Sequence, residues 1–292
     1  RPPRSTRKES SAASDVYKRQ VELEADGTVS PDRLAAVLDA ADQPVSVVSI
    51  MVINNETGVV NDIPALVEVT RRHAPGAWFH TDAVQALAWI DLAAHVDGAD
   101  LISITGHKFG GPVGTGALFV RHGVELDAQI LGGGQERGRR AGTPDVAGAA
   151  AFAAAATATV AARDTDVVRL GALRDRLVVG LRDRLGEVVA PTVLDGGAPV
   201  AAGIAHVVLA DIEAEALLFL LDAAGLRASA ASSCSSGAQD PSHVLAAMGV
   251  DRMVAQGSLR LSLGHTTTEA EIEAALECIP PAVERLRAHG GG

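Results

Sequence analysis

The sequence predicts an α/β fold with a mostly parallel sheet flanked by helices, followed by a smaller C-terminal α+β domain. Short β-branched apolar runs alternate with longer stretches of helical periodicity, which is the pattern of strands joined by crossover helices. Such crossovers are right-handed and lay successive strands parallel to one another. The chain has 292 residues, 47% of them hydrophobic, so it can bury one large core or two ordinary ones.

The N-terminal residues 1–20 differ from the rest of the chain. This segment is serine-rich and basic, shows no apolar periodicity, and meets Val21 without a linker. We interpret it as a non-native or disordered tail and leave it out of the fold prediction.

The first folded half, residues 21–145, is expected to form a large domain. Its first strand should run from Val45 to Ile53 and end at Asn54-Asn55-Glu56-Thr57-Gly58. The elements that follow are a helix from Asp62 to His73, a strand from Ala77 to His80, a helix opening at Asp82, and strands from Ala99 to Thr105 and from Gly114 to Val120. Ligands gather at the carboxyl ends of parallel strands, where Asn55, Asp82, Gln85, Thr105, His107 and Lys108 all fall.

The second half, residues 146–292, is expected to form a bridging helix and the small domain. An alanine-rich helix should have Pro144 in its first turn, and Leu170 to Leu185 shows amphipathic spacing. The later elements are a strand from Ile204 to Leu209, a helix from Glu213 to Ala224, a small-residue loop from Ser229 to Gln239, a helix from Ser242 to Met248, a strand from Leu259 to Leu263 and a final helix from Thr268.

Composition disfavours several classes of function. The tail carries six of the 25 basic residues and two of the 36 acidic ones, so the remainder has a net charge of −15 and should not bind nucleic acid or an anionic membrane. We find no apolar run long enough to span a bilayer and no signal peptide, so we expect a cytoplasmic protein. Two cysteines, Cys234 and Cys278, cannot build a disulfide framework, and neither suggests a metal site.

Lys108 is the candidate nucleophile. It is the only lysine after the tail, against eighteen arginines in the same region. An arginine keeps its proton, whereas a lysine amine can lose it and attack a carbonyl. We therefore predict that Lys108 forms a Schiff base, although an arginine-biased composition could also leave one lysine on an exposed loop.

Asp82 is the candidate partner of that lysine. In pyridoxal-phosphate enzymes a carboxylate pairs with the pyridinium nitrogen and keeps it protonated, so that the ring can accept electrons. An aspartate at the end of a strand could equally cap the helix that follows. The pairing with Lys108 favours the cofactor role.

Five motifs carry a family resemblance. They occur in the order and spacing found in cysteine desulfurases, and the chain resembles this family from about Val21 to the last helix. The motifs are Asn54-Asn55-Glu56-Thr57-Gly58, His80-Thr81-Asp82-Ala83-Val84-Gln85, Thr105-Gly106-His107-Lys108, the glycine- and arginine-rich run from Gly132 to Thr143, and Ser258-Leu259-Arg260-Leu261-Ser262. Cysteine desulfurases are fold-type I, class V aminotransferase-like pyridoxal-phosphate enzymes.

The resemblance implies a role for each matching residue near the cofactor ring. Lys108 would bind pyridoxal 5′-phosphate and move the Cα proton of the substrate, while Asp82 would pair with the pyridine nitrogen. Gln85 and Asn55 would address the ring hydroxyl, and Asn55 would also lie near the substrate carboxylate.

Three further roles concern the phosphate and the substrate. Thr105 and His107 would bind the phosphate, and Thr143 would reach the phosphate of the neighbouring subunit in a homodimer. Arg260 would clamp the substrate carboxylate, a task suited to a guanidinium fork. Taken singly, each of these residues also fits an ordinary structural role.

Cys234 lies in a run of small residues from Ser229 to Gly237, a few residues before Pro241-Ser242-His243-Val244-Leu245. The resembling family places its sulfur-accepting cysteine here. The implied reaction removes sulfur from L-cysteine, leaving L-alanine and a persulfide on Cys234, which would pass to an iron–sulfur scaffold or a tRNA-thiolation acceptor. Cys278 lies in the apolar periodicity of the last helix and should be a packing residue.

Three alternatives stay open. Within the class, the chain could be a selenocysteine lyase or another class V aminotransferase, and outside it a catalytically silent scaffold. Family members begin about a hundred residues earlier, with a Gly-Ala-Thr-Glu phosphate loop and a stacking histidine that this sequence lacks. Losing charge-assisted hydrogen bonds of about 1.5–3 kcal/mol each would weaken cofactor binding, so we expect an active parent enzyme and a weak or inert fragment.

Overall fold

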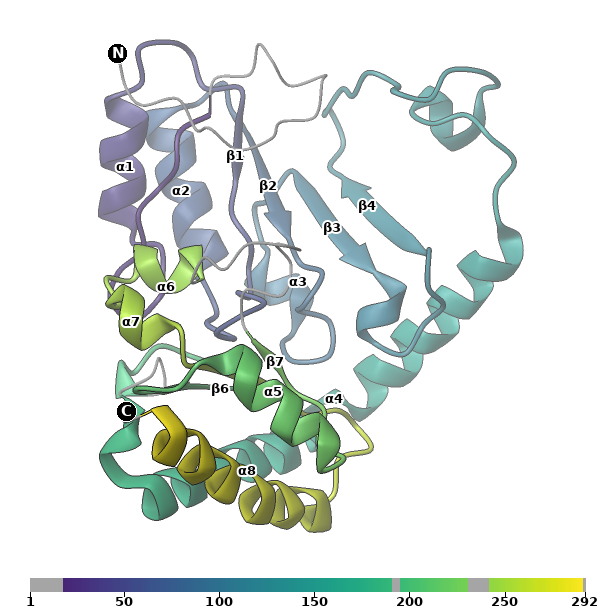
Figure 1. Cartoon of the computed structure of the whole chain (residues 1–292). Helices are drawn as coiled ribbons and strands as arrows, with labels where there is room; N and C mark the ends of the chain where they lie inside the picture. The colour runs from purple at the N-terminus through teal and green to yellow at the C-terminus, as the bar shows by residue number, and fades with distance from the viewer. Residues whose placement is uncertain (1–17, 191–194, 231–241, 291–292) are drawn as a thin grey trace.

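The computed structural model describes residues 18–190, 195–230 and 242–290 (Figure 1). These residues form two four-stranded sheets with separate hydrophobic cores, joined by one long helix. The predicted boundary between residues 145 and 146 falls at the N-cap of that helix, and the division into domains stays a prediction.

The first sheet has the strand order β1-β2-β3-β4. Strands β1, β2 and β3 are parallel and β4 is antiparallel to β3, which confirms the mostly parallel sheet. The strands are β1 (Val47–Ser49), β2 (Trp78–Asp82), β3 (Leu101–Thr105) and β4 (Gly116–Val120).

Two helices cover one face of this sheet, α1 (Pro31–Asp39) and α2 (Ile63–His73), which lie side by side in Figure 1. Leu34, Leu66 and Phe79 are almost fully buried in the shared core, because the apolar stripes of both helices face the strands. The sequence interpretation did not include α1, although Ser30 caps it and Pro31 opens it.

Two expectations for this half were wrong. The first strand is three residues long rather than running from Val45 to Ile53, although beyond it Ile50 and Val52 still donate to the carbonyls of His80 and Asp82. No helix opens at Asp82; turns follow it, and the next helix is the short α3 (Leu92–His95).

The helix α4 (Val146–Leu185) is 40 residues long and joins the two sheets. It begins after Asp145, whose side chain accepts a hydrogen bond from the Gly148 amide, so Pro144 precedes the helix instead of opening it. The prediction that the chain has no apolar run of membrane-spanning length was wrong: Val146–Val188 is long and apolar enough by length and composition, because alanine fills much of it. Only 6% of its most apolar window is buried.

The second sheet is antiparallel throughout, in the order β5-β6-β8-β7. Its strands are β5 (Val189–Ala190), β6 (Ile204–Leu209), β7 (Ser229–Ala230) and β8 (Ser258–Ser262). Its helices are α5 (Ala214–Ala223), α6 (His243–Ala247), α7 (Arg252–Ala255) and α8 (Glu269–Gly290). The strand from Ile204 to Leu209 was predicted with its correct ends, and the α5, α6, β8 and α8 predictions were right to within one residue at each predicted end.

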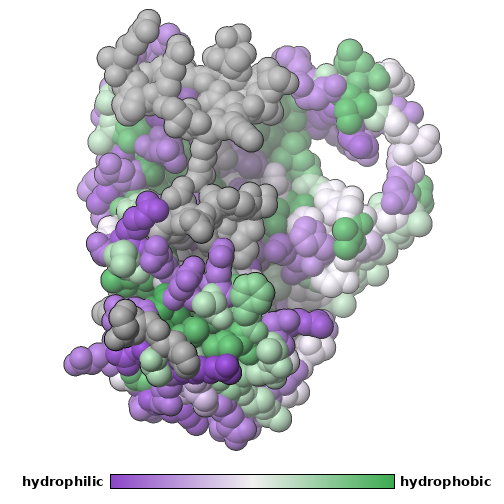
Figure 2. Space-filling view, viewed as in Figure 1, coloured by the Kyte–Doolittle hydropathy of each residue, from purple (hydrophilic) through white to green (hydrophobic). Residues whose placement is uncertain are grey.

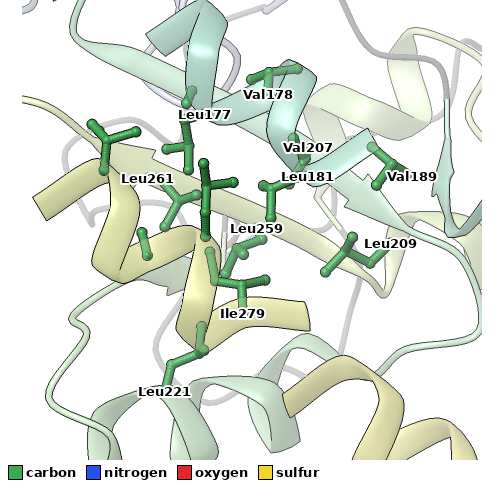
Figure 3. Close-up of a cluster of buried hydrophobic side chains, with 14 of the residues drawn as sticks. Leu177, Val178, Leu181, Val189, Val207, Leu209, Leu221, Leu259, Leu261 and Ile279 are labelled. Carbon is green, nitrogen blue, oxygen red and sulfur yellow. The ribbon is translucent and has the colours of Figure 1, made fainter. Parts of the chain in front are cut away.

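The core of the second half lies where α4 and α8 pack on this sheet. Leu177 and Leu181 of α4 meet Leu259 and Leu261 of β8 and Ile279 of α8 (Figure 3). All six residues of β6 are buried, so both faces of the strand are covered, with His206 as its one polar side chain. The C-terminal half of α4 therefore serves as a core helix, while its alanine-rich N-terminal half is largely exposed and contacts the first half of the chain through Gly148 and Phe152.

Candidate active site

The carboxyl ends of β2 and β3 bring four of the nine predicted site residues to one edge. Asp82 is the last residue of β2 and pairs with Ser103 of the neighbouring parallel strand, while Thr105 ends β3. His107 and Lys108 follow at once in the short 3-10 helix η1 (Gly106–Lys108). In Figure 1 both strands point toward the second sheet, so this edge faces the second half of the chain.

Asp82 is anchored by its own turn. Its Oδ1 accepts a hydrogen bond of 2.9 Å from the Val84 amide, while Oδ2 has no hydrogen-bond partner among the described residues. The side chain is half-buried. Asp82 thus has one oxygen free to pair with a cationic group, and the helix-cap interpretation no longer applies because no helix follows.

Lys108 is exposed, and its amine makes no hydrogen bond or salt bridge within the described part of the chain. The backbone beneath it is rigid. Gly106 is buried so tightly that an added Cβ would collide with the Thr115 hydroxyl, and Phe109 packs edge-on against Phe152 of α4 with centroids 5.1 Å apart. The Lys108 amine is therefore free, while close packing of Gly106 and Phe109 holds the backbone that carries it.

Thr105 and His107 touch one another. The Thr105 hydroxyl lies 3.0 Å from His107 Nδ1 and donates to the Thr115 carbonyl at 3.1 Å. The outer ring nitrogen of His107, Nε2, has no partner in the described residues, and the ring is exposed. Both side chains lie at the end of β3, and because the Thr105 proton is engaged by the Thr115 carbonyl, the free polar atom that this pair presents is His107 Nε2.

His80 is a residue that the sequence interpretation quoted in a motif but gave no role. Two residues before Asp82 in β2, it lies 2.8 Å from Ser49 Oγ through Nδ1 and 2.8 Å from Ser103 Oγ through Nε2. Burial lowers the pKa of His80, and the Asp82 charge opposes that change. His80 therefore links β1, β2 and β3 next to Asp82. The sequence could have indicated this position, because residues two apart in a strand lie on the same face.

Asn55 and Arg260 meet across the two halves of the chain. Arg260 of β8 donates from Nη1 to the Asn55 carbonyl at 2.8 Å, although 205 residues separate them. The Arg260 Nε is buried and has no partner in the described structure, so the guanidinium keeps a donor for a further acceptor. The structure thus brings together the two residues predicted to address the substrate carboxylate.

The remaining predicted residues stand apart. Gln85 is half-buried in the turn after Asp82, and Thr143 is exposed in the loop between the 3-10 helix η2 (Gln135–Gly138) and α4. No hydrogen bond joins Thr143 to the strand-end residues within the described ranges. Cys234 lies outside the described residues, and Cys278 is half-buried against the second core.

No cluster of three or more potential metal ligands occurs in the part of the chain that the structure describes. The predicted site residues that the structure describes offer a free amine, a carboxylate, a guanidinium, hydroxyl groups and an imidazole. This set matches a cofactor with a carbonyl, a cationic ring nitrogen and an anionic group better than it matches a hydrolytic triad.

Comparisons with known proteins identify the family of the chain. Residues 11–275 match the model of the family described as aminotransferase class-V, a match that starts inside the N-terminal segment set aside above. The chain is 45% identical over 264 residues to an IscS-like cysteine desulfurase of Mycobacterium tuberculosis and 41% identical over 242 residues to a cysteine desulfurase of Gluconacetobacter diazotrophicus. These alignments cover 90% and 83% of this chain, but 66% and 59% of the relatives.

Among solved structures, the chain is similar to a NifS-like protein from Rickettsia africae. The TM-score is 0.79 at 28% sequence identity, with 92% of this chain and 69% of that chain covered. The fold is therefore shared with NifS-like proteins, and the chain spans about two thirds or less of the length of the curated relatives named above.

Proposed function

Because the chain belongs to the class-V aminotransferase family, we propose that it carries the lysine, ring-partner and substrate-clamp residues of a pyridoxal-phosphate-dependent cysteine desulfurase. One observation supports this most: Asp82 and Lys108 follow adjacent parallel strands at the same edge, each with a free polar atom. Cysteine desulfurases of this family use pyridoxal 5′-phosphate, and the residues present fit it.

The fit rests on unpaired polar atoms. Lys108 offers a free amine, Asp82 a free carboxylate oxygen, and Arg260 a buried donor without a partner. Thr105 and His107 would hold the phosphate, and Gln85 and Asn55 would hold the ring hydroxyl. Pyridoxal phosphate, when bound, supplies an aldehyde that captures the substrate amine and a ring that withdraws electrons from the substrate Cα.

The residues of this chain then supply orientation and proton transfer. The Lys108 amine takes the proton from the substrate Cα and returns it, while the Asp82 carboxylate holds the proton on the ring nitrogen. Arg260 and Asn55 orient the carboxylate of L-cysteine. The Cys234 thiolate is the proposed sulfur acceptor, so the products are L-alanine and a persulfide.

We also propose partners and a compartment. Thr143 is exposed, and so are the apolar side chains of Ile130, Leu131 and Val146, which are 51%, 82% and 75% exposed. Figure 2 shows green atoms on the same outlying arm, which carries η2. This surface supports a homodimer with Thr143 toward the partner subunit. The persulfide would pass to an iron–sulfur scaffold or a tRNA-thiolation acceptor, in the cytoplasm.

The test is the visible absorption spectrum of the purified chain with pyridoxal phosphate, before and after L-cysteine, beside Lys108→Ala. We expect a band that requires Lys108 and changes when L-cysteine is added, followed by L-alanine release that Cys234→Ser reduces at least about a hundredfold. A band that survives in Lys108→Ala, or full sulfur release by Cys234→Ser, would contradict the proposal. A Lys108-dependent band without turnover would fit a site that needs the rest of the longer relatives.

A further inference from the structure

Glu56 is a buried carboxylate next to Asn55 that the proposed reaction does not use. It is 4% exposed and lies in the turn between β1 and α2. Burial raises its pKa, and the Ser242 hydroxyl, His243 and Arg260 oppose that rise. A buried carboxylate destabilises a protein unless it is hydrogen-bonded, so the partner of Glu56 matters.

That partner comes from the other half of the chain. The Ser242 hydroxyl donates a short hydrogen bond to Glu56 Oε2, across 186 residues of sequence, and Ser242 is 2% exposed. The same oxygen caps α6, because it accepts hydrogen bonds from the amides of Val244 at 3.1 Å and Leu245 at 3.3 Å. Glu56 therefore orients the hydroxyl whose lone pairs hold the first turn of α6.

The turn that carries Glu56 is itself rigid. Asn54 Oδ1 accepts from the amides of Glu56 at 2.9 Å and Thr57 at 3.0 Å. Gly58 adopts a positive φ of 80° and packs so closely on Ile204 and Val200 that an added Cβ would lie 3.0 Å from each. A displacement of α6 is thus transmitted to the backbone of this turn rather than absorbed by it.

Asn55 is held in the same turn from the opposite side, through the Arg260 hydrogen bond to its carbonyl. Two consecutive residues of this turn are therefore tied to the second half of the chain. Glu56 is tied to Ser242 at the start of α6, and Asn55 is tied to Arg260 of β8. Both joints are partly or fully buried, so water does not replace them at low cost.

We propose that Glu56 is a positioning residue that locks the first turn of α6 onto the turn presenting Asn55. Ser242 follows Cys234, the proposed sulfur acceptor, by eight residues in the sequence. The lock therefore fixes Ser242, eight residues along the chain from that cysteine, relative to the turn that presents Asn55. The role rests on the proposed function, whereas the lock itself does not.

The first experiment tests the lock by a measurement that does not depend on enzymatic activity. Hydrogen exchange of residues 54–58 and 242–248 is measured in the full chain for Glu56→Ala, Ser242→Ala, the double variant and Glu56→Gln. We expect Glu56→Ala to speed exchange of both segments about tenfold or more, and the double variant to show no further increase. Glu56→Gln keeps an acceptor oxygen and should stay within about twofold of wild type.

The control is Glu68→Ala, which removes an exposed carboxylate whose only described partner is the i,i+4 arginine. It should leave both segments unchanged. Independent effects of Glu56→Ala and Ser242→Ala, or unchanged exchange in Glu56→Ala, would overturn the lock.

The second experiment tests positioning in protein that shows the Lys108-dependent band. Glu56→Ala should lower kcat for L-alanine release about tenfold, change KM less than about twofold, and keep the band, while Glu56→Gln restores kcat. An equal loss of band and kcat, or an unchanged kcat, would overturn the positioning role. If no variant and no wild-type protein shows the band, the proposed function is contradicted. The hydrogen-exchange result then still shows whether Glu56 locks α6 to the turn.

Discussion

His206 is a buried titratable residue whose surroundings lower its pKa strongly. It lies in β6 opposite Arg260 of β8, with Nε2 2.9 Å from Ser258 Oγ and no partner for Nδ1 in the described residues. Burial first, and the Arg260 charge second, lower its pKa to about 4. At neutral pH the ring is therefore uncharged, which lets it lie beside the Arg260 guanidinium without repulsion.

The low pKa of His206 predicts a loss of stability in acid. The unfolded chain binds a proton below about pH 6.5 and the folded chain only below about 4, so the contribution of His206 is present above 6.5 and lost as pH falls through this window. Urea unfolding of His206→Gln and wild type should show wild type losing up to about 3 kcal/mol relative to the variant between pH 7 and pH 4. A difference independent of pH would contradict this assignment.

Glu56 predicts a pH effect of the opposite sign. Its pKa is raised above the ordinary value of 4.5, so its favourable contribution is present below 4.5 and lost as pH rises through the folded pKa. Glu56→Gln should therefore become more stable relative to wild type as pH rises above 4.5. The measurement is the urea midpoint of both proteins at each pH, with Glu68→Gln as an exposed control that should show no such trend.

At the scale of single elements, two aspartates that each precede a helix differ in whether the side chain caps that helix. Asp62 precedes α2 and its Oδ1 accepts from the Ala65 amide at 3.1 Å, whereas Asp91 precedes α3 and makes no side-chain cap hydrogen bond. Both residues are exposed aspartates, so only the local geometry differs.

This difference predicts unequal costs of substitution. Asp62→Ala should lower the free energy of unfolding by about 1 kcal/mol, because it leaves a helix amide without its acceptor. Asp91→Ala should cost less than about 0.5 kcal/mol. Both values come from urea unfolding at neutral pH, and equal losses would show that charge near the helix end, not the hydrogen bond, is the stabilising term.

At the scale of the whole molecule, Trp89 links the two cores. Its side chain packs against the clusters of both sheets, and Gly203, which precedes β6, lies against its ring. A Cβ at Gly203 would collide with Trp89 and lie 2.8 Å from the Leu263 carbonyl, while one at Gly264 would meet nothing within 4 Å.

Gly203→Ala should therefore loosen the contact between the two halves. We expect a loss of about 1–3 kcal/mol in unfolding free energy and altered Trp89 fluorescence in a Trp78→Phe background, because the ring must shift. Gly264→Ala should match its parent in both measurements. Unchanged fluorescence in Gly203→Ala would mean that the two halves do not pack through Trp89.

The sequence by itself determined the α/β class, the ends of β6, most helices, and the edge where Asp82, Thr105, His107 and Lys108 gather. These features follow from local periodicity and from the rule that parallel strands end together, so they need no knowledge of distant contacts.

Only the tertiary structure decided the short β1, the turns after Asp82, the single long α4, and the contacts of Arg260 with Asn55 and of Glu56 with Ser242. These last pairs lie 205 and 186 residues apart, and burial makes the polar groups of each depend on the other. Local patterns carry no record of such partners, because a hydrogen bond between distant segments is set by how the two sheets pack.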